Sequence, residues 1–164
     1  MSSIRVCTKN SEQVVREYAD MLLHLAIAKT RNREYAQEVV QDTFLRLLEK
    51  TRDFNSDEHL KAWLIRVTIN NCKKLWGTAW FQKTVALEPE MYGTTVMEEK
   101  SEVYYAMLEL PEKYRVVLHL YYYEEMPIKE IAKVLDLNPA TVETRVHRAR
   151  GLLKKKLKGE YDYA

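Results

Sequence analysis

The chain has 164 residues, of which 46% are hydrophobic and 30% are charged. This length allows one domain or two small ones, and the apolar content is enough to form real cores. Only four glycines and four prolines occur, which leaves little scope for a β-rich fold. The sequence shows no secretory signal peptide and no apolar run as long as a membrane span, so we expect no membrane insertion.

Cysteine and histidine are too sparse to suggest a metal centre. The two cysteines, Cys7 and Cys72, lie in unlike contexts, and four histidines are scattered along the chain. Neither residue type has the spacing of metal ligands or of a disulfide framework. We therefore expect no metal, no cofactor and a reducing, cytoplasmic environment.

The net charge of +2 conceals strongly charged blocks. Residues 59–87 contain five Lys or Arg and no acidic residue, whereas residues 84–112 contain seven Glu against one Lys, a local charge of −6. Residues 145–158 are basic again, with seven Lys or Arg and no acidic residue. Such alternation is typical of two modules that face nucleic acid and are separated by an acidic segment.

Two helices are predicted near the N-terminus. Residues 1–10 are interpreted as a ragged end, and Ser11 can cap a helix that runs to about Lys29. Asn32 can cap the next helix, from Arg33 to about Thr51. The first helix is expected to bury Val14, Val15, Tyr18, Leu22, Leu25 and Ala26. The second is expected to bury Val39, Val40, Phe44, Leu47 and Leu48, and to turn outward Gln41, Asp42, Arg46, Glu49 and Lys50.

After a short loop at 52–56, a third helix is predicted from about Asp57 to Gly77, where the glycine can act as a C-terminal cap. Aromatic rings beside basic and amide side chains suit single-stranded nucleic acid, because every base offers a face for stacking. The alternative, that the tryptophans here are core residues, fits the same spacing. The expected core side is Leu60, Leu64, Val67 and Leu75; the outer arc is Arg66, Asn70 and Lys73, with Trp63 at its edge and Trp76, Trp80 and Phe81 nearby.

Between about residues 80 and 100 the periodicity fades, and Pro89 and Gly93 mark an acidic linker. Beyond it, Ser101 can cap a helix through Leu108, and a further helix opens at Pro111. We expect both helices to pack under the pair of helices that follows. Their inward residues are expected to be Val103, Tyr104, Met107, Leu108, Tyr114, Val117, Leu118 and Tyr121.

The segment from Pro127 to Lys158 has the pattern of two helices joined by a sharp turn. Asn138 is a good N-cap and Pro139 suits the first helical position, so the second helix should begin there. A short helix, a tight turn and a longer helix with a basic outer face predict a helix-turn-helix, whose second helix enters the DNA major groove. The apolar faces are Ile128, Ile131, Ala132 and Leu135, then Val142, Val146, Ala149 and Leu153; Thr144, His147, Arg148 and Lys155 are turned away, with Thr141 and Arg145 at the flanks.

Two features of this segment leave an alternative open. Two amphipathic helices and a turn also occur in ordinary helical bundles, and a Lys-rich helix end suits the helix dipole. The turn departs from the usual pattern, because Asp136 stands near the left-handed position that glycine commonly occupies. Asp tolerates this conformation better than most residues, so we expect the turn to form at some cost in strain.

Two blocks of the sequence together resemble the bacterial RNA polymerase sigma factors of the sigma-70 family, in the extracytoplasmic-function (ECF) group. The first block is EVVQDTFLRLLEKTRDF at 38–54, followed by WLIRVTINNCKK from Trp63. The second is LPEKYRVVLHLYYYEEMPIKEIAKVLDLNPATVETRVHRARGLLKKKL at 110–157. Motifs like the second also end many response regulators, so the specificity lies in both blocks occurring in this order around an acidic linker. The resemblance implies an all-α protein that is not itself an enzyme.

The resemblance also implies residues for three contacts. The loop Phe54 to Leu60 and the helix after it would read and melt the minus-ten element. Asn55-Ser56 stands where the family often carries Arg-Gly, so the base preference of this loop stays open. Core polymerase would be bound by Gln41, Asp42, Phe44, Leu45 and Arg46. Minus-ten DNA would be bound by Trp63, Arg66, Asn70, Lys73 and Lys74, and minus-thirty-five DNA by Thr141, Thr144, Arg145, His147, Arg148 and Lys155.

The domain organisation implied by the resemblance has three parts. Residues 1–79 would form a region 2-like domain, 80–100 an acidic linker that threads toward the polymerase active site, and 101–164 a region 4-like helix-turn-helix domain. The expected partners are core RNA polymerase, promoter DNA and an anti-sigma factor. Two alternatives remain from the residues alone: a helix-turn-helix transcriptional regulator that is not a polymerase subunit, and a structural or adaptor helical protein.

Overall fold

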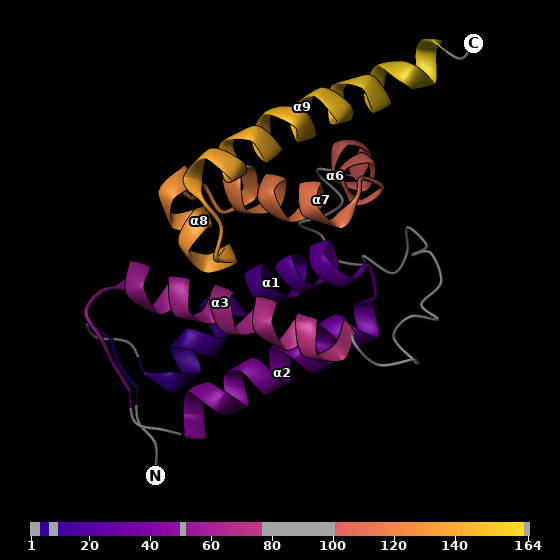
Figure 1. The fold of residues 1–164 in the computed structure, drawn as a ribbon. Coiled ribbons are helices and arrows are strands. Elements are labelled where there is room, and N and C mark those ends of the chain that lie inside the picture. The colour runs from indigo at the N-terminus through magenta and orange to yellow at the C-terminus, as the bar shows by residue number, and fades with distance from the viewer. Residues whose placement is uncertain (1–3, 7–9, 50–51, 77–100, 163–164) are drawn as a thin grey trace. The chain divides into compact units, whose positions relative to one another are not determined.

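The structure, a computed structural model, describes residues 4–6, 10–49, 52–76 and 101–162. The chain divides into two compact units, Met1–Val85 and Ala86–Ala164. Within the described residues each unit is built from packed helices, and the exceptions are two strands of three residues (Figure 1). The all-α prediction is confirmed. The predictions for Gly77, Trp80, Phe81, Cys7 and the acidic linker lie outside the described residues, as do those for the side chains of Lys50, Leu75 and Trp76.

The N-terminal unit is a bundle of three helices, α1 (Ser11–Thr30), α2 (Arg33–Glu49) and α3 (Asp57–Trp76), each in contact with the other two (Figure 1). The apolar sides of the three helices pack together into one core, because each of these sides must be covered from water. The core is formed by fully buried side chains that include Leu22, Leu25, Leu47, Leu60, Leu64 and Ile65. Val15 and Val67, predicted to be core, are only half-buried.

Asparagine side chains cap the first two helices. The Asn10 side chain accepts a hydrogen bond from the Gln13 amide at 2.9 Å, and the Gln13 side chain accepts one from the Asn10 amide at 2.9 Å. This reciprocal capping box satisfies two amide groups that have no partner within the helix. The prediction that Ser11 is the cap was therefore wrong by one residue. At α2 the predicted cap is confirmed, because Asn32 accepts from the Tyr35 amide at 3.0 Å.

A short parallel pair of strands joins two segments that lie far apart in the sequence. Strand β1 (Ile4–Val6) pairs with β2 (Arg52–Phe54), with Ile4 opposite Arg52. The predictions of a ragged end at 1–10 and a loop at 52–56 were wrong for these residues. Three residues are too few to show an alternating pattern, and the pairing depends on the bundle bringing the two segments together.

The C-terminal unit consists of α6 (Ser101–Leu108), α7 (Glu112–Leu118), the π-helix η2 (His119–Tyr123), α8 (Ile128–Leu135) and α9 (Pro139–Asp162). Helices α6, α7 and α8 all pack against α9, as predicted (Figure 1). The π-helix η2 was not predicted. Directly after it, the Glu124 amide donates a hydrogen bond to the His119 carbonyl at 3.1 Å. Among the expected core residues, Val103 is 44% exposed, and Tyr114 and Tyr121 are half-buried.

The turn between α8 and α9 has the conformation that the sequence predicts. Asp136 is left-handed, with φ of 57°. Its amide donates to the Lys133 carbonyl at 3.3 Å, and the Leu137 amide donates to the Ala132 carbonyl at 2.8 Å. This is the Schellman arrangement, which satisfies the last carbonyls of a helix. Asn138 then caps α9, since its side chain accepts from the Ala140 amide at 2.9 Å.

Two general properties bear on function. Within the described part of the chain, none of the helices combines the length and apolar character that a membrane span requires. Among the same described residues, no group of His, Cys, Asp or Glu side chains is arranged to hold a metal ion.

Candidate functional site

Four of the five residues predicted to bind polymerase lie on the exposed side of α2. Gln41 is exposed, Asp42 and Arg46 are half-exposed, and Leu45 is 58% exposed. Leu48, which the sequence placed in the core, is 38% exposed on the same side of the helix. We call Gln41, Asp42, Leu45, Arg46 and Leu48 the α2 ridge. An exposed pair of leucines flanked by charges is a surface suited to another protein.

Phe44 does not belong to this ridge. Its side chain is 8% exposed and lies in the core of the three-helix bundle. Phe44 was expected to contact polymerase. Because its ring is buried, we assign it a supporting role instead, in which it holds α2 in the bundle. Leu48 is the residue that sequence reasoning missed. The sequence does carry a signal for it, because α2 has more apolar residues than one buried side can hold.

Asp42 and Arg46 form an ion pair along the ridge. The Arg46 Nε atom lies 3.0 Å from the Asp42 Oδ2 atom, and the two side chains are 39% and 50% exposed. An acidic residue four positions before a basic one is the favourable order on a helix. Pairs of this kind contribute only about 0.3–0.5 kcal/mol, so the pair orients the two side chains more than it stabilises the fold.

The outer face of α3 carries the residues predicted to bind minus-ten DNA. Arg66, Asn70, Lys73 and Lys74 are exposed together on α3, and Trp63 is half-buried at the edge of this group. We call these five residues the α3 face. The Trp63 ring meets the Phe54 ring edge-on, with centroids 5.9 Å apart and planes at 66°. The unpredicted strand β2 thus provides the buried ring that supports Trp63.

The loop before α3 is held by two hydrogen bonds. The Ser56 side chain accepts from the His59 amide at 3.1 Å, and His59 Nδ1 accepts from the Asn55 amide at 3.1 Å. The His59 ring also lies 5.1 Å from the Phe54 ring. His59 therefore anchors the loop, a role that the sequence analysis did not assign. The spacing Ser-x-x-His resembles a capping box and is the signal that could have found it.

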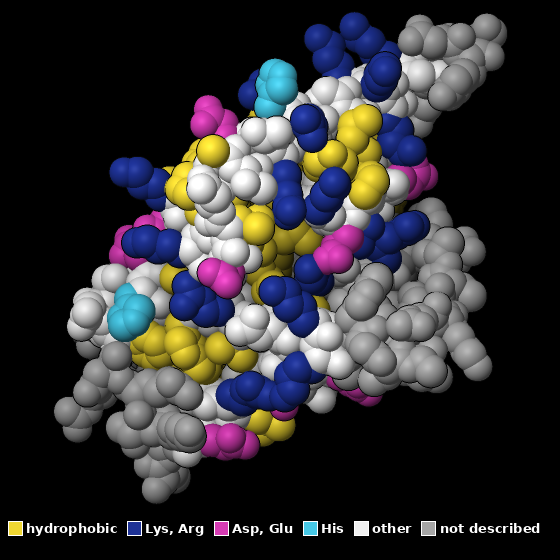
Figure 2. Space-filling view, in the orientation of Figure 1, with side chains coloured by type: hydrophobic (Ala, Val, Ile, Leu, Met, Phe, Trp, Pro, Cys, Tyr) yellow, Lys and Arg dark blue, Asp and Glu magenta, His cyan; other side chains and the backbone are white. Residues whose placement is uncertain are grey.

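The outer side of α9 carries the predicted minus-thirty-five residues. Val142, Val146 and Ala149 are buried at 0%, 6% and 0% exposure, which fixes the side of the helix that faces the unit's core. Thr144, His147, Arg148 and Lys155 are exposed on the other side, and Thr141 and Arg145 are half-buried at its flanks. We call these six residues the α9 face. Lys and Arg side chains follow α9 in the space-filling view (Figure 2).

Two segments of the chain match a known protein family. Residues 14–81 match Sigma-70 region 2, and residues 100–153 match Sigma-70, region 4. The two matches together cover most of the chain, in the order that the family requires. The chain belongs to the sigma-70 family of RNA polymerase sigma factors. The α2 ridge and the α3 face of this sigma factor lie within region 2; the match to region 4 contains α8 and α9 as far as residue 153.

Similar proteins place the sigma factor in the ECF group. It is 28% identical to the "ECF RNA polymerase sigma factor SigW" of Bacillus subtilis (strain 168), over 88% of this chain and 87% of the relative. It is also 25% identical to the "RNA polymerase sigma-H factor" of Pseudomonas aeruginosa, over 88% of this chain and 84% of that protein.

Solved structures show the same fold. The chain matches the sigma factor RpoE, from a co-crystal structure with the anti-sigma factor NepR from Bartonella quintana, with a TM-score of 0.71 and 23% identity over 90% of this chain and 96% of that one. It matches CnrH, from a complex with the cytosolic domain of CnrY, with a TM-score of 0.66 and 26% identity over 91% of this chain and 88% of that one.

Membership of the family decides the function. The protein is an RNA polymerase sigma factor that directs transcription initiation, and it is not catalytic. Sigma factors bind core RNA polymerase and promoter DNA. The match of residues 14–81 to region 2 excludes the alternative of a helix-turn-helix regulator that acts without being a polymerase subunit.

Proposed function

We propose that each of the three surfaces of this sigma factor has a separate function in transcription initiation. The α2 ridge docks on core polymerase, the α3 face with loop 54–60 captures and melts the minus-ten element, and the α9 face reads the minus-thirty-five element. The proposal assigns residues 1–79 to the first two tasks and 101–164 to the third. Residues 80–100 act as the connecting linker.

The observation that carries this proposal is the chemistry of the exposed sides. The α2 ridge mixes exposed leucines with both signs of charge, which suits a protein partner. The α3 face contains no acidic residue and has an aromatic ring at its edge, which suits a single strand with unstacked bases. The α9 face presents Arg148 and His147 from a helix-turn-helix, the geometry that reads base edges in the major groove.

The acidic linker has a proposed function of its own. Within the linker, residues 88–99 contain four Glu and no Lys or Arg. A negatively charged chain can occupy a channel that polymerase otherwise offers to nucleic acid, because the channel walls carry the opposite charge. We infer that this segment threads toward the polymerase active site and the RNA exit channel.

A regulatory protein partner is also proposed. The solved structure of RpoE holds the anti-sigma factor NepR, and that of CnrH holds the cytosolic domain of CnrY. An anti-sigma factor that covers the α2 ridge or the α9 face would keep this sigma factor from polymerase or from DNA. The proposed place of this regulation is the cytoplasm, where polymerase and promoters are found.

The test is reconstituted transcription with core polymerase, the full chain and a promoter library. We expect specific transcripts with the wild-type chain, loss of polymerase binding when the α2 ridge is changed, loss of melting when the α3 face is changed, and altered upstream preference when the α9 face is changed. Should a variant of the α2 ridge fail only in upstream preference, the assignment of the surfaces would be wrong.

A further inference from the structure

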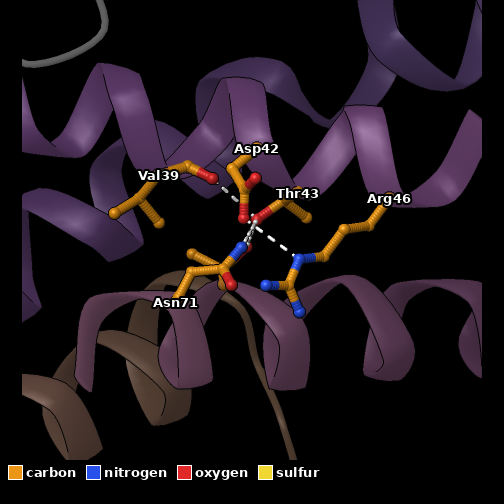
Figure 3. Close-up of polar contacts among 6 residues, drawn as sticks. Val39, Asp42, Thr43, Arg46 and Asn71 are labelled. Carbon is orange, nitrogen blue, oxygen red and sulfur yellow. Dashed lines mark hydrogen bonds and ion pairs between the residues drawn. The ribbon is translucent and has the colours of Figure 1, made fainter. Parts of the chain in front are cut away.

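Three buried polar side chains cross the apolar interface between α2 and α3. Thr43 and Thr68 are 0% exposed, and Asn71 is 3% exposed. The Asn71 side-chain nitrogen donates to the Thr43 hydroxyl at 3.1 Å, and the Thr68 hydroxyl lies 3.4 Å from the Thr43 hydroxyl. The two helices are thus joined by a polar contact in which Thr43 and Asn71 point toward each other (Figure 3), and Asn71 also lines a pocket with Glu38, Asp42 and Lys74.

The direction of each hydrogen bond follows from the single proton of the Thr43 hydroxyl. This proton is donated to the Val39 carbonyl, which lies 2.8 Å from Thr43 Oγ1. Thr43 can therefore only accept from α3, so the Asn71 amide must turn its nitrogen toward Thr43. The Asn71 oxygen is then left buried with no hydrogen-bond partner among the described residues.

The polar contact contributes little net stability to the bundle. A buried acceptor without a partner costs about 1–3 kcal/mol, and replacing a buried polar pair by apolar side chains of the same shape is near neutral or stabilising. A leucine at position 71 would fill the same interface without leaving an oxygen unpaired. Where a buried polar contact is not needed for stability, its best-documented role is to fix the register of two packed helices.

The geometry of the contact suits such a role. Thr68 and Asn71 are separated by one turn of α3, and both meet Thr43, so Thr43 is held between two successive turns. A slip of α3 by one turn would move its residues by about 5.4 Å and break both contacts. Thr43 follows Asp42 of the α2 ridge, and Asn71 follows Asn70 of the α3 face, so this register sets the spacing between the two surfaces.

We propose that Thr43 and Asn71 are positioning residues for promoter melting. They lock the α3 face in one register against the α2 ridge, so that docking on polymerase places Asn70 and the neighbouring lysines at the strand to be captured. This proposal rests on the proposed function of the two surfaces. It assigns no contact with DNA or polymerase to Thr43 or Asn71, because both side chains are buried.

The test compares stability with melting in the full chain bound to core polymerase. Asn71→Leu removes the unpaired oxygen and leaves Thr43 bonded to the Val39 carbonyl. Thr43→Val, Thr68→Val and Asn71→Leu together remove all three polar groups. For both variants we expect a free energy of unfolding equal to or above that of the wild type, polymerase affinity within about twofold of the wild type, and open-complex formation slowed by about tenfold or more.

Thr43→Ser is the matched control. It keeps the hydroxyl and loses a buried methyl group, so its stability should fall while its rate of open-complex formation stays near that of the wild type. A purely structural role predicts that melting follows stability in all three variants. Normal permanganate reactivity at the minus-ten element in folded Asn71→Leu would overturn the proposal. Failure of both leucine variants to fold would overturn it too, since the contact would then serve stability.

The failure of this proposal can be told apart from failure of the proposed function. If the docking assignment is wrong, reversing the charges of Asp42 and Arg46 leaves polymerase affinity unchanged. If only the register proposal is wrong, that charge reversal weakens binding as expected and Asn71→Leu melts the promoter at the normal rate.

Discussion

The guanidinium of Arg46 lies beside the carboxylate of Asp42, one helical turn earlier on α2, with 3.0 Å between Nε and Oδ2. A second ion pair of the same spacing lies on α1, where Arg16 and Glu12 are 2.7 Å apart. Both pairs are solvent-accessible, so neither contributes much to the stability of the bundle. They differ in their surroundings, because the pair on α2 belongs to the ridge with exposed leucines.

The first prediction uses this pair to test polymerase docking. Asp42→Arg combined with Arg46→Glu keeps an ion pair on α2 and inverts the charges that polymerase meets. We expect unchanged thermal unfolding and a loss of affinity for core polymerase of about tenfold or more, because complementary charges become like charges across the interface. Affinity is measured by fluorescence anisotropy with labelled sigma factor.

The matching exchange on α1, Glu12→Arg with Arg16→Glu, serves as the control. It makes the same chemical change on a different helix and should leave affinity for polymerase unchanged. Equal affinity of the α2 variant and this control would show that the ridge is not the docking surface.

The second prediction concerns strand opening. Asn70→Ala and Lys73→Ala each remove an exposed group of the α3 face without touching the core. We expect slower open-complex formation in both variants, with binding to a minus-thirty-five duplex almost unchanged. Permanganate footprinting at the minus-ten element measures the opening, and Lys113→Ala in the other unit is the control. Normal footprints in both variants would remove the α3 face from the mechanism.

The helices and the helix-turn-helix could be predicted because their signals are local. Apolar residues at helical spacing, Asn32 and Asn138 at helix starts and Asp136 at the turn act within a few residues of themselves. The two strands could not be predicted, since a three-residue segment shows no period and its pairing depends on the folded bundle.

The candidate surfaces were only partly predictable for a related reason. Phe44 and Leu48 are both apolar and lie one turn apart on α2, yet one is 8% and the other 38% exposed. The choice between them is made by α1 and α3, which cover one side of α2 and not the other. The contact between Thr43 and Asn71 could not be predicted from the sequence either, because each residue by itself is an ordinary polar side chain in a helix.

The third prediction concerns strain in the helix-turn-helix. Asp136 has φ of 57°, a conformation that costs free energy for residues with a side chain. Asp136→Gly should raise the free energy of unfolding of the C-terminal unit by roughly 0.5 kcal/mol, the gain being reduced by the greater freedom of glycine in the unfolded chain. Lys133→Gly, three residues earlier inside α8, should lower it by about 1 kcal/mol. Hydrogen exchange of amides in α8 and α9 measures both; destabilisation by Asp136→Gly would contradict the argument.

The fourth prediction concerns alkaline pH. Burial raises the pKa of the Tyr123 phenol above 10.0, because the ionised form is poorly solvated there. The unfolded chain therefore releases this proton at lower pH than the folded chain. The contribution of Tyr123 to the free energy of unfolding is thus fully present below pH 10 and is lost as pH rises through the folded pKa. Tyr123→Phe should flatten the fall in stability above pH 10, measured by urea unfolding. Tyr122→Phe, at a ring that is 47% exposed, is the control; an equal effect of the two changes would refute the burial argument.

The last prediction separates base reading from phosphate binding on α9. Val142, Val146 and Ala149 fix the buried side, so Thr144, His147 and Arg148 project outward together from the first half of the helix. That half reaches base edges when such a helix enters the major groove. An arginine can bond to two acceptors of one guanine, and a good bidentate contact discriminates between bases by roughly 1–3 kcal/mol.

Arg148→Ala should therefore relax the preference at one or two upstream promoter positions. Lys155 lies about two turns further along and is expected to meet only phosphates, so Lys155→Ala should weaken binding to all sequences alike and lower the salt slope by about one unit. Both variants are measured on a library of upstream elements at several salt concentrations. A uniform loss of affinity for Arg148→Ala, together with changed base preference for Lys155→Ala, would mean that α9 lies in the groove in the opposite sense.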